Sequence, residues 1–270
     1  MERDVHVTVW DETCGAGPRA ILVHGSTTWG DDPVFGFAAQ RPLAARYRVL
    51  AMDRRGHGRS GPSRSPGYTS DYEADAEDIA ALLGDGAHLV GHSYGATGAM
   101  LAAARHPGSV LSLTLIEPGS YQAAADDPVV AAALRANRES TARMPAGPTP
   151  EAYLRAATAS VGLPPLEPDP RRLRAAEAAM RERHCWEAPV PVAELAAAPW
   201  PKLVISGTWE TAPALYRERG GEPLMACARV TAARIGARLL RVPGSGHYAH
   251  VDRPDAVNAA LDDLWSSPAA

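Results

Sequence analysis

One serine in this chain stands in surroundings that suit covalent chemistry. Residues 91–95 read Gly-His-Ser-Tyr-Gly and follow directly on the apolar run Leu89-Val90. This G-x-S-x-G pattern is typical of a sharp turn from a strand into a helix, with the serine hydroxyl exposed at its top. Glycine at positions 91 and 95 avoids the collisions that side chains would make there. The free N–H groups at the start of the following helix would face the reacting centre. Ser93 is therefore a candidate nucleophile for acyl transfer.

A serine hydroxyl is a weak nucleophile until a base accepts its proton. Nine histidines compete for this role, and most of them fall in turns, at a helix end or in segments without supporting context. His247 follows Gly244-Ser245-Gly246 in a loop after the last expected strand, which agrees with a nucleophile–acid–base order along the chain. His247 is therefore the predicted base.

The elements that would position these residues form an alternating pattern of strands and helices. Short apolar or alternating runs predict strands at 5–10, 19–24, 47–52, 87–90, 112–116, 202–206 and 237–242. Segments rich in helix-forming residues predict helices at 70–83, 96–105, 213–235 and 255–265. Nearly all-apolar strands that alternate with helices indicate an α/β fold, with a mostly parallel sheet covered by helices on both faces.

The strand rhythm stops between residues 119 and 199. This stretch is rich in alanine and arginine, helical in pattern and interrupted by prolines. We expect it to be an insertion over the carboxyl ends of the strands, where ligands bind in sheets of this kind. Residues 1–118 and 200–270 would then form the core, and residues 119–199 a helical lid or cap.

Composition and charge narrow the range of partners. The chain has 270 residues, of which 46% are hydrophobic and 21% charged, and its formal net charge is −4. This balance argues against binding to nucleic acid or to an anionic membrane surface. The first residues do not read as a signal peptide, and no apolar run is long enough to span a membrane. We therefore expect a cytoplasmic protein with a small-molecule substrate, whose oligomeric state the sequence leaves open.

The cysteines and histidines show no arrangement that predicts a metal or redox centre. Cys14, Cys185 and Cys227 are odd in number and lack the spacing of metal ligands or of a redox pair. We expect thiols in a reducing compartment. Neither a metal nor a cofactor is expected.

Four motifs occur in order along the chain, namely His24-Gly25, residues 53–61 (DRRGHGRSG), residues 91–95 and residues 244–247. Together they resemble the α/β-hydrolase fold family, specifically its lid-bearing, serine esterase-like branch. The resemblance covers nearly the whole chain outside the insertion, and it implies a catalytic triad and an oxyanion hole. Few residues precede the strand at 19–24, so the leading hairpin of the family is expected to be shortened here.

The acid that would orient His247 is open between two glutamates. The family most often has an aspartate in a G-x-x-D pattern after the strand at 202–206, and Glu210 takes that slot in Gly207-Thr208-Trp209-Glu210. Some relatives carry the acid after the strand that follows the elbow helix, where this chain has Glu117. Glutamate is one methylene longer than aspartate, so either carboxylate could reach the histidine. Glu210 is the preferred candidate and Glu117 the alternative.

The resemblance also places an oxyanion hole at two backbone N–H groups, those of Ser26 and Tyr94. Aromatic side chains that flank the catalytic loops or lie in the insertion are candidates for the wall of an apolar substrate pocket. These candidates are Trp29, Trp186, Trp209 and Tyr248.

These residues predict a serine hydrolase that cleaves a carboxylic ester, lactone or thioester of a small apolar molecule. Ser93 would attack the carbonyl with His247 as base, and water would release the acyl group from the enzyme. Two alternatives stay open. The same fold would also serve an acyl-transferring cyclase, or a lyase with His247 as its base. It also hosts ligand-sensing proteins that do not catalyse a reaction.

Overall fold

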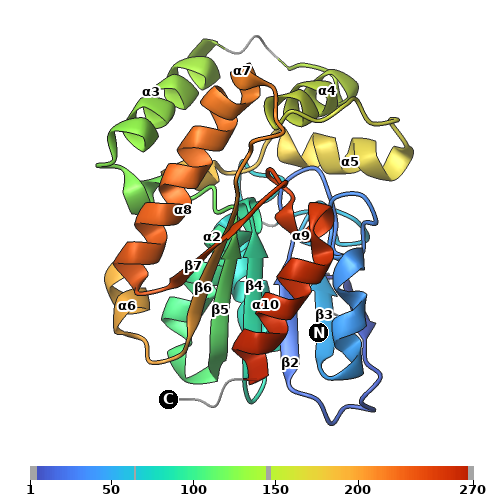
Figure 1. The fold of residues 1–270 in the computed structure, drawn as a ribbon. Helices are drawn as coiled ribbons and strands as arrows, with labels where there is room; N and C mark the ends of the chain where they lie inside the picture. Colours follow the sequence, from blue (N-terminus) through green and yellow to red (C-terminus); the bar gives the residue numbers. More distant parts are fainter. Residues whose placement is uncertain (1–4, 64, 144–146, 267–270) are drawn as a thin grey trace.

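A central sheet of seven strands organises the computed structural model, which describes residues 5–63, 65–143 and 147–266. Its strand order is β1-β3-β2-β4-β5-β6-β7 (Figure 1). The strands are β1 (Val7–Trp10), β2 (Arg19–Val23), β3 (Arg48–Met52), β4 (Ala87–His92), β5 (Val110–Ile116), β6 (Lys202–Gly207) and β7 (Arg238–Val242). β1 pairs antiparallel with β3, and the other pairings are parallel. The predicted α/β fold with a mostly parallel sheet is confirmed.

Helices cover both faces of this sheet, as strands without a polar face require. One face packs against α1 (Tyr72–Leu83), α2 (Tyr94–Arg105) and α8 (Glu222–Ile235). The opposite face packs against η1 (Ala38–Ala45) and α10 (Pro254–Ser266). All residues of β4 are buried, because this strand lies between β2 and β5 near the middle of the sheet. The turn that follows β4 is therefore anchored to the buried centre of the sheet.

Between β5 and β6, the described part of residues 119–199 is largely helical. Its longer helices are α3 (Pro128–Arg143), α4 (Pro150–Ser160), α5 (Pro170–Ala179) and α6 (Val192–Ala197). Figure 1 shows α3, α4 and α5 above the sheet, whereas α6 lies lower, beside α8. Leu195 of α6 belongs to the same apolar core as α2 and α8. The division into core and lid stays a prediction, and this packing places α6 with the core.

Shorter elements complete the described chain. They are η2 (Pro107–Ser109), η3 (Tyr121–Ala124), η4 (Cys185–Glu187), α7 (Ala214–Tyr216), η5 (Arg217–Gly221) and α9 (Ala249–Asp252). The helix expected at 213–235 is thus α7, η5 and α8 in succession, and η5 is a widened, π-helical stretch. A Cβ atom on Gly221 would lie 2.7 Å from the Trp209 ring, so glycine lets the helix pass close to this buried side chain.

No described helix combines the length and the apolar character that crossing a membrane requires.

Candidate active site

Ser93 occupies the turn between β4 and α2. Its backbone φ of 52° and ψ of −116° form a conformation that serine adopts only where the surrounding structure enforces it. The flanking glycines leave no room for a side chain. A Cβ atom on Gly91 would lie 2.5 Å from Cα of Ala96, and one on Gly95 would lie 2.4 Å from the carbonyl oxygen of Val23. The turn predicted at residues 91–95 therefore depends on both glycines.

His247 lies in the loop between β7 and α9, and its Nε2 atom is 3.0 Å from Oγ of Ser93. The ring of His92 holds this loop, because His92 Nε2 donates a hydrogen bond of 2.9 Å to the carbonyl oxygen of His247. Burial, with a smaller effect of His250, keeps the pKa of His92 well below its usual value, so the His92 ring is neutral. The structure thus brings together the predicted nucleophile and the predicted base.

Glu117 lies at the end of β5, fully buried, with Oε2 3.7 Å from Nδ1 of His247. Its other oxygen, Oε1, accepts a hydrogen bond of 2.7 Å from the Gly207 N–H, and Oε2 also accepts one of 3.2 Å from Nε1 of Trp209. Nδ1 of His247 is buried and has no hydrogen-bond partner among the described residues. The Glu117 carboxylate is therefore held where it can orient the histidine ring.

Glu210 takes a different position. Its side chain is exposed, and Oε1 accepts a hydrogen bond of 2.7 Å from the backbone N–H of Gly244. The structure therefore places Glu117, and not Glu210, beside His247, which is the reverse of the preference expected from the sequence. The physical reason lies in the loop after β6. Trp209, with φ of 56°, turns its ring inward, and the next side chain leaves toward the surface.

Ser26 and Tyr94, the residues whose backbone N–H groups are the predicted oxyanion donors, are both close to the nucleophile along the chain or in space. Tyr94 begins α2 directly after Ser93, and Ser26 follows Gly25, on which a Cβ atom would lie 3.1 Å from Cβ of Ser93. Within the described chain, neither of the two N–H groups donates a hydrogen bond to another residue. Both are therefore free to bind an oxygen of a substrate.

A cavity of about 780 Å³ opens above Ser93 and His247. Its wall comes from α3, from α4 and the residues that flank α4, from the end of β4 and the loops after the strands, and from η4. The residues from α3 and α4 are Asn137, Ser140, Thr141, Ala152, Tyr153, Ala156, Ala157 and Ser160. Sequence reasoning missed them because it did not establish which faces of these helices turn inward. In α3, Ser140 and Thr141 come three and four residues after Asn137, which puts all three polar side chains on one helix face, and this spacing is visible in the sequence.

Two of the four predicted aromatic pocket residues line this cavity, namely Trp186 and Tyr248. The expectation is wrong for Trp29 and Trp209. Trp29 is buried beneath two guanidinium groups, those of Arg171 and Arg172, which lie 4.2 and 4.4 Å from its ring centre. Trp209 has no exposed surface, and it supports the Glu117 carboxylate instead.

Part of this chain is similar in sequence to curated proteins. The chain is 36% identical to 2-(acetamidomethylene)succinate hydrolase of Mesorhizobium japonicum over 108 residues, which are 40% of this chain and 38% of that protein. It is 40% identical to a pimeloyl-[acyl-carrier protein] methyl ester esterase of Chromobacterium violaceum over 106 residues, 39% of either protein. The alignments thus span about two fifths of the length of these relatives.

Solved structures are similar to nearly the whole chain. Their sequence identities to it are low, so this similarity supports the fold alone. The esterase RhEst1 from a Rhodococcus species has a TM-score of 0.67 and 21% identity, with 97% of this chain and 94% of that chain covered. The enol-lactonase of Burkholderia xenovorans has a TM-score of 0.60 and 20% identity, with 97% and 96% covered. A family profile described as "Alpha/beta hydrolase family" matches residues 20–260. Since this match spans most of the sequence and the fold agrees with it, the chain belongs to the alpha/beta hydrolase family.

Proposed function

We propose that this chain is a serine hydrolase that cleaves a carboxylic ester, lactone or thioester through Ser93, His247 and Glu117. One observation carries the proposal. Ser93 Oγ lies 3.0 Å from Nε2 of His247, and Nδ1 of the same ring lies 3.7 Å from Oε2 of Glu117, beneath a cavity of substrate size. Among the curated relatives, the methyl ester esterase supports an ester substrate, and the other relative supports hydrolysis in general.

The geometry defines a role for each group. Oγ of Ser93 attacks the carbonyl carbon of the substrate while Nε2 of His247 accepts its proton. Glu117 stabilises the imidazolium that forms, and contacts of this kind tighten once a substrate is bound. The N–H groups of Ser26 and Tyr94 bind the oxyanion, and one such donor contributes about 3 kcal/mol to transition-state stabilisation.

Departure of the leaving group and the later hydrolysis of the acyl-enzyme use the same groups. His247 returns the proton to the leaving alcohol or thiol as its bond to the acyl carbon breaks. Water then attacks the acyl-enzyme while His247 accepts its proton, and His247 gives this proton to Oγ of Ser93 as the acid leaves. No step requires a metal or a cofactor.

The cavity favours an uncharged and mostly apolar substrate. Among its described lining residues there is no lysine, arginine, aspartate or glutamate. An ionised acyl chain would lose its hydration there without gaining an ionic partner, which is costly. Helices α3 and α4 supply part of this wall, so we include them in the proposed lid. Asn137, Ser140 and Thr141 would bind a hydroxyl or carbonyl group of the substrate.

A fluorophosphonate probe tests the proposal directly, because it forms a stable adduct with an activated serine. The expected result is one adduct per chain, mapped by peptide mass spectrometry to Ser93, and no adduct on a folded Ser93→Ala variant. A panel of neutral esters, lactones and thioesters should give free acids as products, which separates hydrolysis from cyclisation. Folded protein that remains unlabelled, or label at another serine, would refute the proposed nucleophile.

A further inference from the structure

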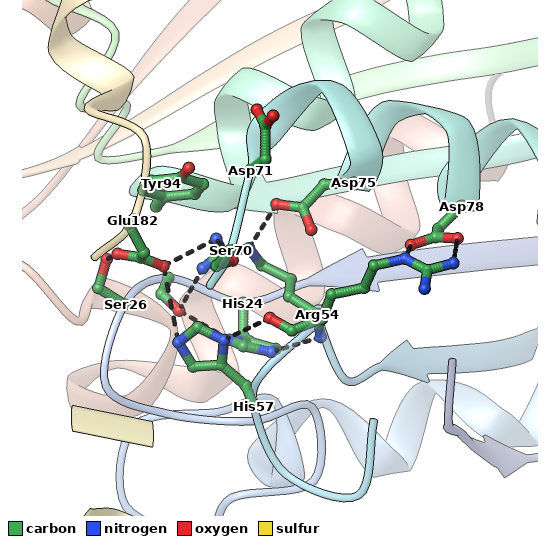
Figure 2. Close-up of polar contacts among 12 residues, drawn as sticks. His24, Ser26, Arg54, His57, Ser70, Asp71, Asp75, Asp78, Tyr94 and Glu182 are labelled. Atoms are coloured by element: carbon green, nitrogen blue, oxygen red, sulfur yellow. Dashed lines mark hydrogen bonds and ion pairs between the residues drawn. The ribbon is translucent and has the colours of Figure 1, made fainter. Parts of the chain in front are cut away.

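A buried carboxylate of the insertion binds the side chain of Ser26 (Figure 2). Glu182 follows α5 and is 8% exposed. Its Oε2 atom accepts a hydrogen bond from the Ser26 hydroxyl, and its Oε1 atom accepts one of 2.8 Å from Nη2 of Arg54. The Ser26 hydroxyl is therefore engaged with the insertion, while the backbone N–H of the same residue is free for a substrate oxygen.

Backbone pairing holds Glu182 in place. The Thr69 N–H donates a hydrogen bond of 3.1 Å to the carbonyl oxygen of Arg181, and the Arg183 N–H donates one of 3.0 Å to that of Ser70. The residues on both sides of Glu182 are thus tied to the segment that leads into α1. The core therefore helps to fix the position of the Glu182 side chain, together with the helices of the insertion.

Arg54 is a rigid partner for this carboxylate. It is fully buried, its Nε donates a hydrogen bond of 2.7 Å to Asp75, and its Nη1 donates one of 3.2 Å to the Gly25 carbonyl oxygen. Its guanidinium carbon also lies 3.8 Å from the centre of the Tyr94 ring. Burial alone would lower the pKa of Arg54, but the carboxylates of Asp75 and Glu182 raise it, so the charge persists. Arg54 thus contacts Gly25, next to one oxyanion donor, and Tyr94, which carries the other.

His57 completes the surroundings of the carboxylate without adding a charge. Burial lowers the pKa of His57 to about 4, so its ring is neutral near pH 7. Its Nδ1 atom donates a hydrogen bond of 3.1 Å to the carbonyl oxygen of Arg55, which leaves Nε2 without a proton, 3.6 Å from Oε1 of Glu182. Among residues 5–63, 65–143 and 147–266, the side chains that donate hydrogen bonds to the Glu182 carboxylate are therefore Arg54 and Ser26.

We propose that Glu182 is a positioning residue for the oxyanion hole, an inference that rests on the proposed serine hydrolase function. By accepting a hydrogen bond from the Ser26 hydroxyl, the Glu182 carboxylate holds the Ser26 residue in place and so fixes the direction of its backbone N–H. The backbone beyond Ser26 needs such support, because Thr27 has a strained φ of 59°. A displacement of about 1 Å at a reacting centre can reduce the rate about 100-fold. The loss of this contact therefore acts on the transition state more than on substrate binding.

A double-mutant cycle tests this role with the full-length protein. Glu182→Gln leaves a single acceptor oxygen, for which Arg54 and the Ser26 hydroxyl then compete, and Ser26→Ala removes the donor. We expect each variant to lower kcat about 10- to 100-fold and to change KM by less than about threefold. Because both changes break one contact, the double variant should be no slower than the slower single variant.

Phenylboronic acid provides a second measurement, because its adduct with Ser93 mimics the tetrahedral intermediate. Its inhibition constant should rise by about the same factor as kcat falls in both variants. Glu187→Gln is the matched control, since Glu187 also pairs with an arginine, Arg138, within the insertion. This control should retain kcat and boronate affinity. Melting temperatures by circular dichroism establish that each variant is folded.

Three results would overturn the inference. They are an unchanged kcat, a change confined to KM, or losses that add fully in the double variant. If Glu182→Gln does not fold, Ser26→Ala decides alone, because it removes one hydroxyl, and an unchanged kcat then refutes the role. The proposed function is checked separately by fluorophosphonate labelling of Ser93 in the wild type. A labelled wild type with a normal Glu182→Gln variant disproves this inference and leaves the hydrolase proposal intact.

Discussion

Oε2 of Glu117 lies 3.7 Å from Nδ1 of His247, although the two residues follow different strands of the sheet. Glu117 directly follows β5 and His247 follows β7, and β6 lies between these two strands in the sheet. The last residue of β6 and the loop after it supply the two donors that hold the carboxylate, the N–H of Gly207 and Nε1 of Trp209. Three neighbouring loops thus build the acid and base pair.

Exchange of the two glutamates for glutamine separates their roles. Glu117→Gln should lower kcat by about 10⁴-fold, because an amide no longer stabilises the imidazolium or selects the productive ring tautomer. Glu210→Gln is the matched control and should change kcat by less than about threefold, since its side chain is exposed and bonds to Gly244. Steady-state kinetics on a neutral ester measures both. The opposite ranking would return the acid role to Glu210.

Gly95→Ala should destabilise the turn that carries Ser93. A Cβ atom there would lie 2.4 Å from the carbonyl oxygen of Val23, so the backbone of the central sheet would have to shift. Such overpacking costs about 1–3 kcal/mol or more, which lowers Tm by several degrees in a chain of this size. Gly108→Ala is the control, because nothing lies within 4 Å of its Cβ position. Equal melting temperatures for the two variants would contradict this packing argument.

Acid should weaken the fold through histidines that are buried in the neutral form. His88 is an isolated example on β4, where burial alone lowers its pKa to about 4. The unfolded chain, with a histidine pKa near 6.5, then binds more protons between about pH 6.5 and 4. The contribution of His88 is therefore complete above pH 6.5 and is lost as the pH falls through this window, by roughly 3 kcal/mol in total.

The difference between the wild type and a His88→Gln variant isolates this effect. The free energy of unfolding, measured by urea titration at several pH values, should fall less steeply below pH 6.5 in the variant. Asp75 acts in the opposite direction, since burial raises its pKa to about 6, but it is present in both proteins. If the free energies of unfolding of the two proteins change in parallel with pH, then His88 has the same pKa in the folded and unfolded states.

The sequence alone determined the elements whose cause is local. Residues 91–95 predicted the strand, turn and helix around Ser93, because the collision that Gly91 avoids arises within a few residues, with Gly95 and Ala96. Apolar strands that alternate with helices predicted the parallel sheet, because a strand that is buried on both faces is apolar along nearly its whole length. The loop after the last strand likewise predicted His247, because the chain order of the motifs is visible in the sequence.

The tertiary structure alone decided which distant groups meet. Glu117 and Glu210 are equivalent as residue types, and the choice between them depends on the inward turn of Trp209 and on the Gly244 N–H that binds the other carboxylate. The contact of Ser26 with Glu182 likewise joins residues far apart in the sequence. A side chain takes the direction in which some other segment supplies a hydrogen-bond donor or an apolar contact. That segment is known only once the chain is packed.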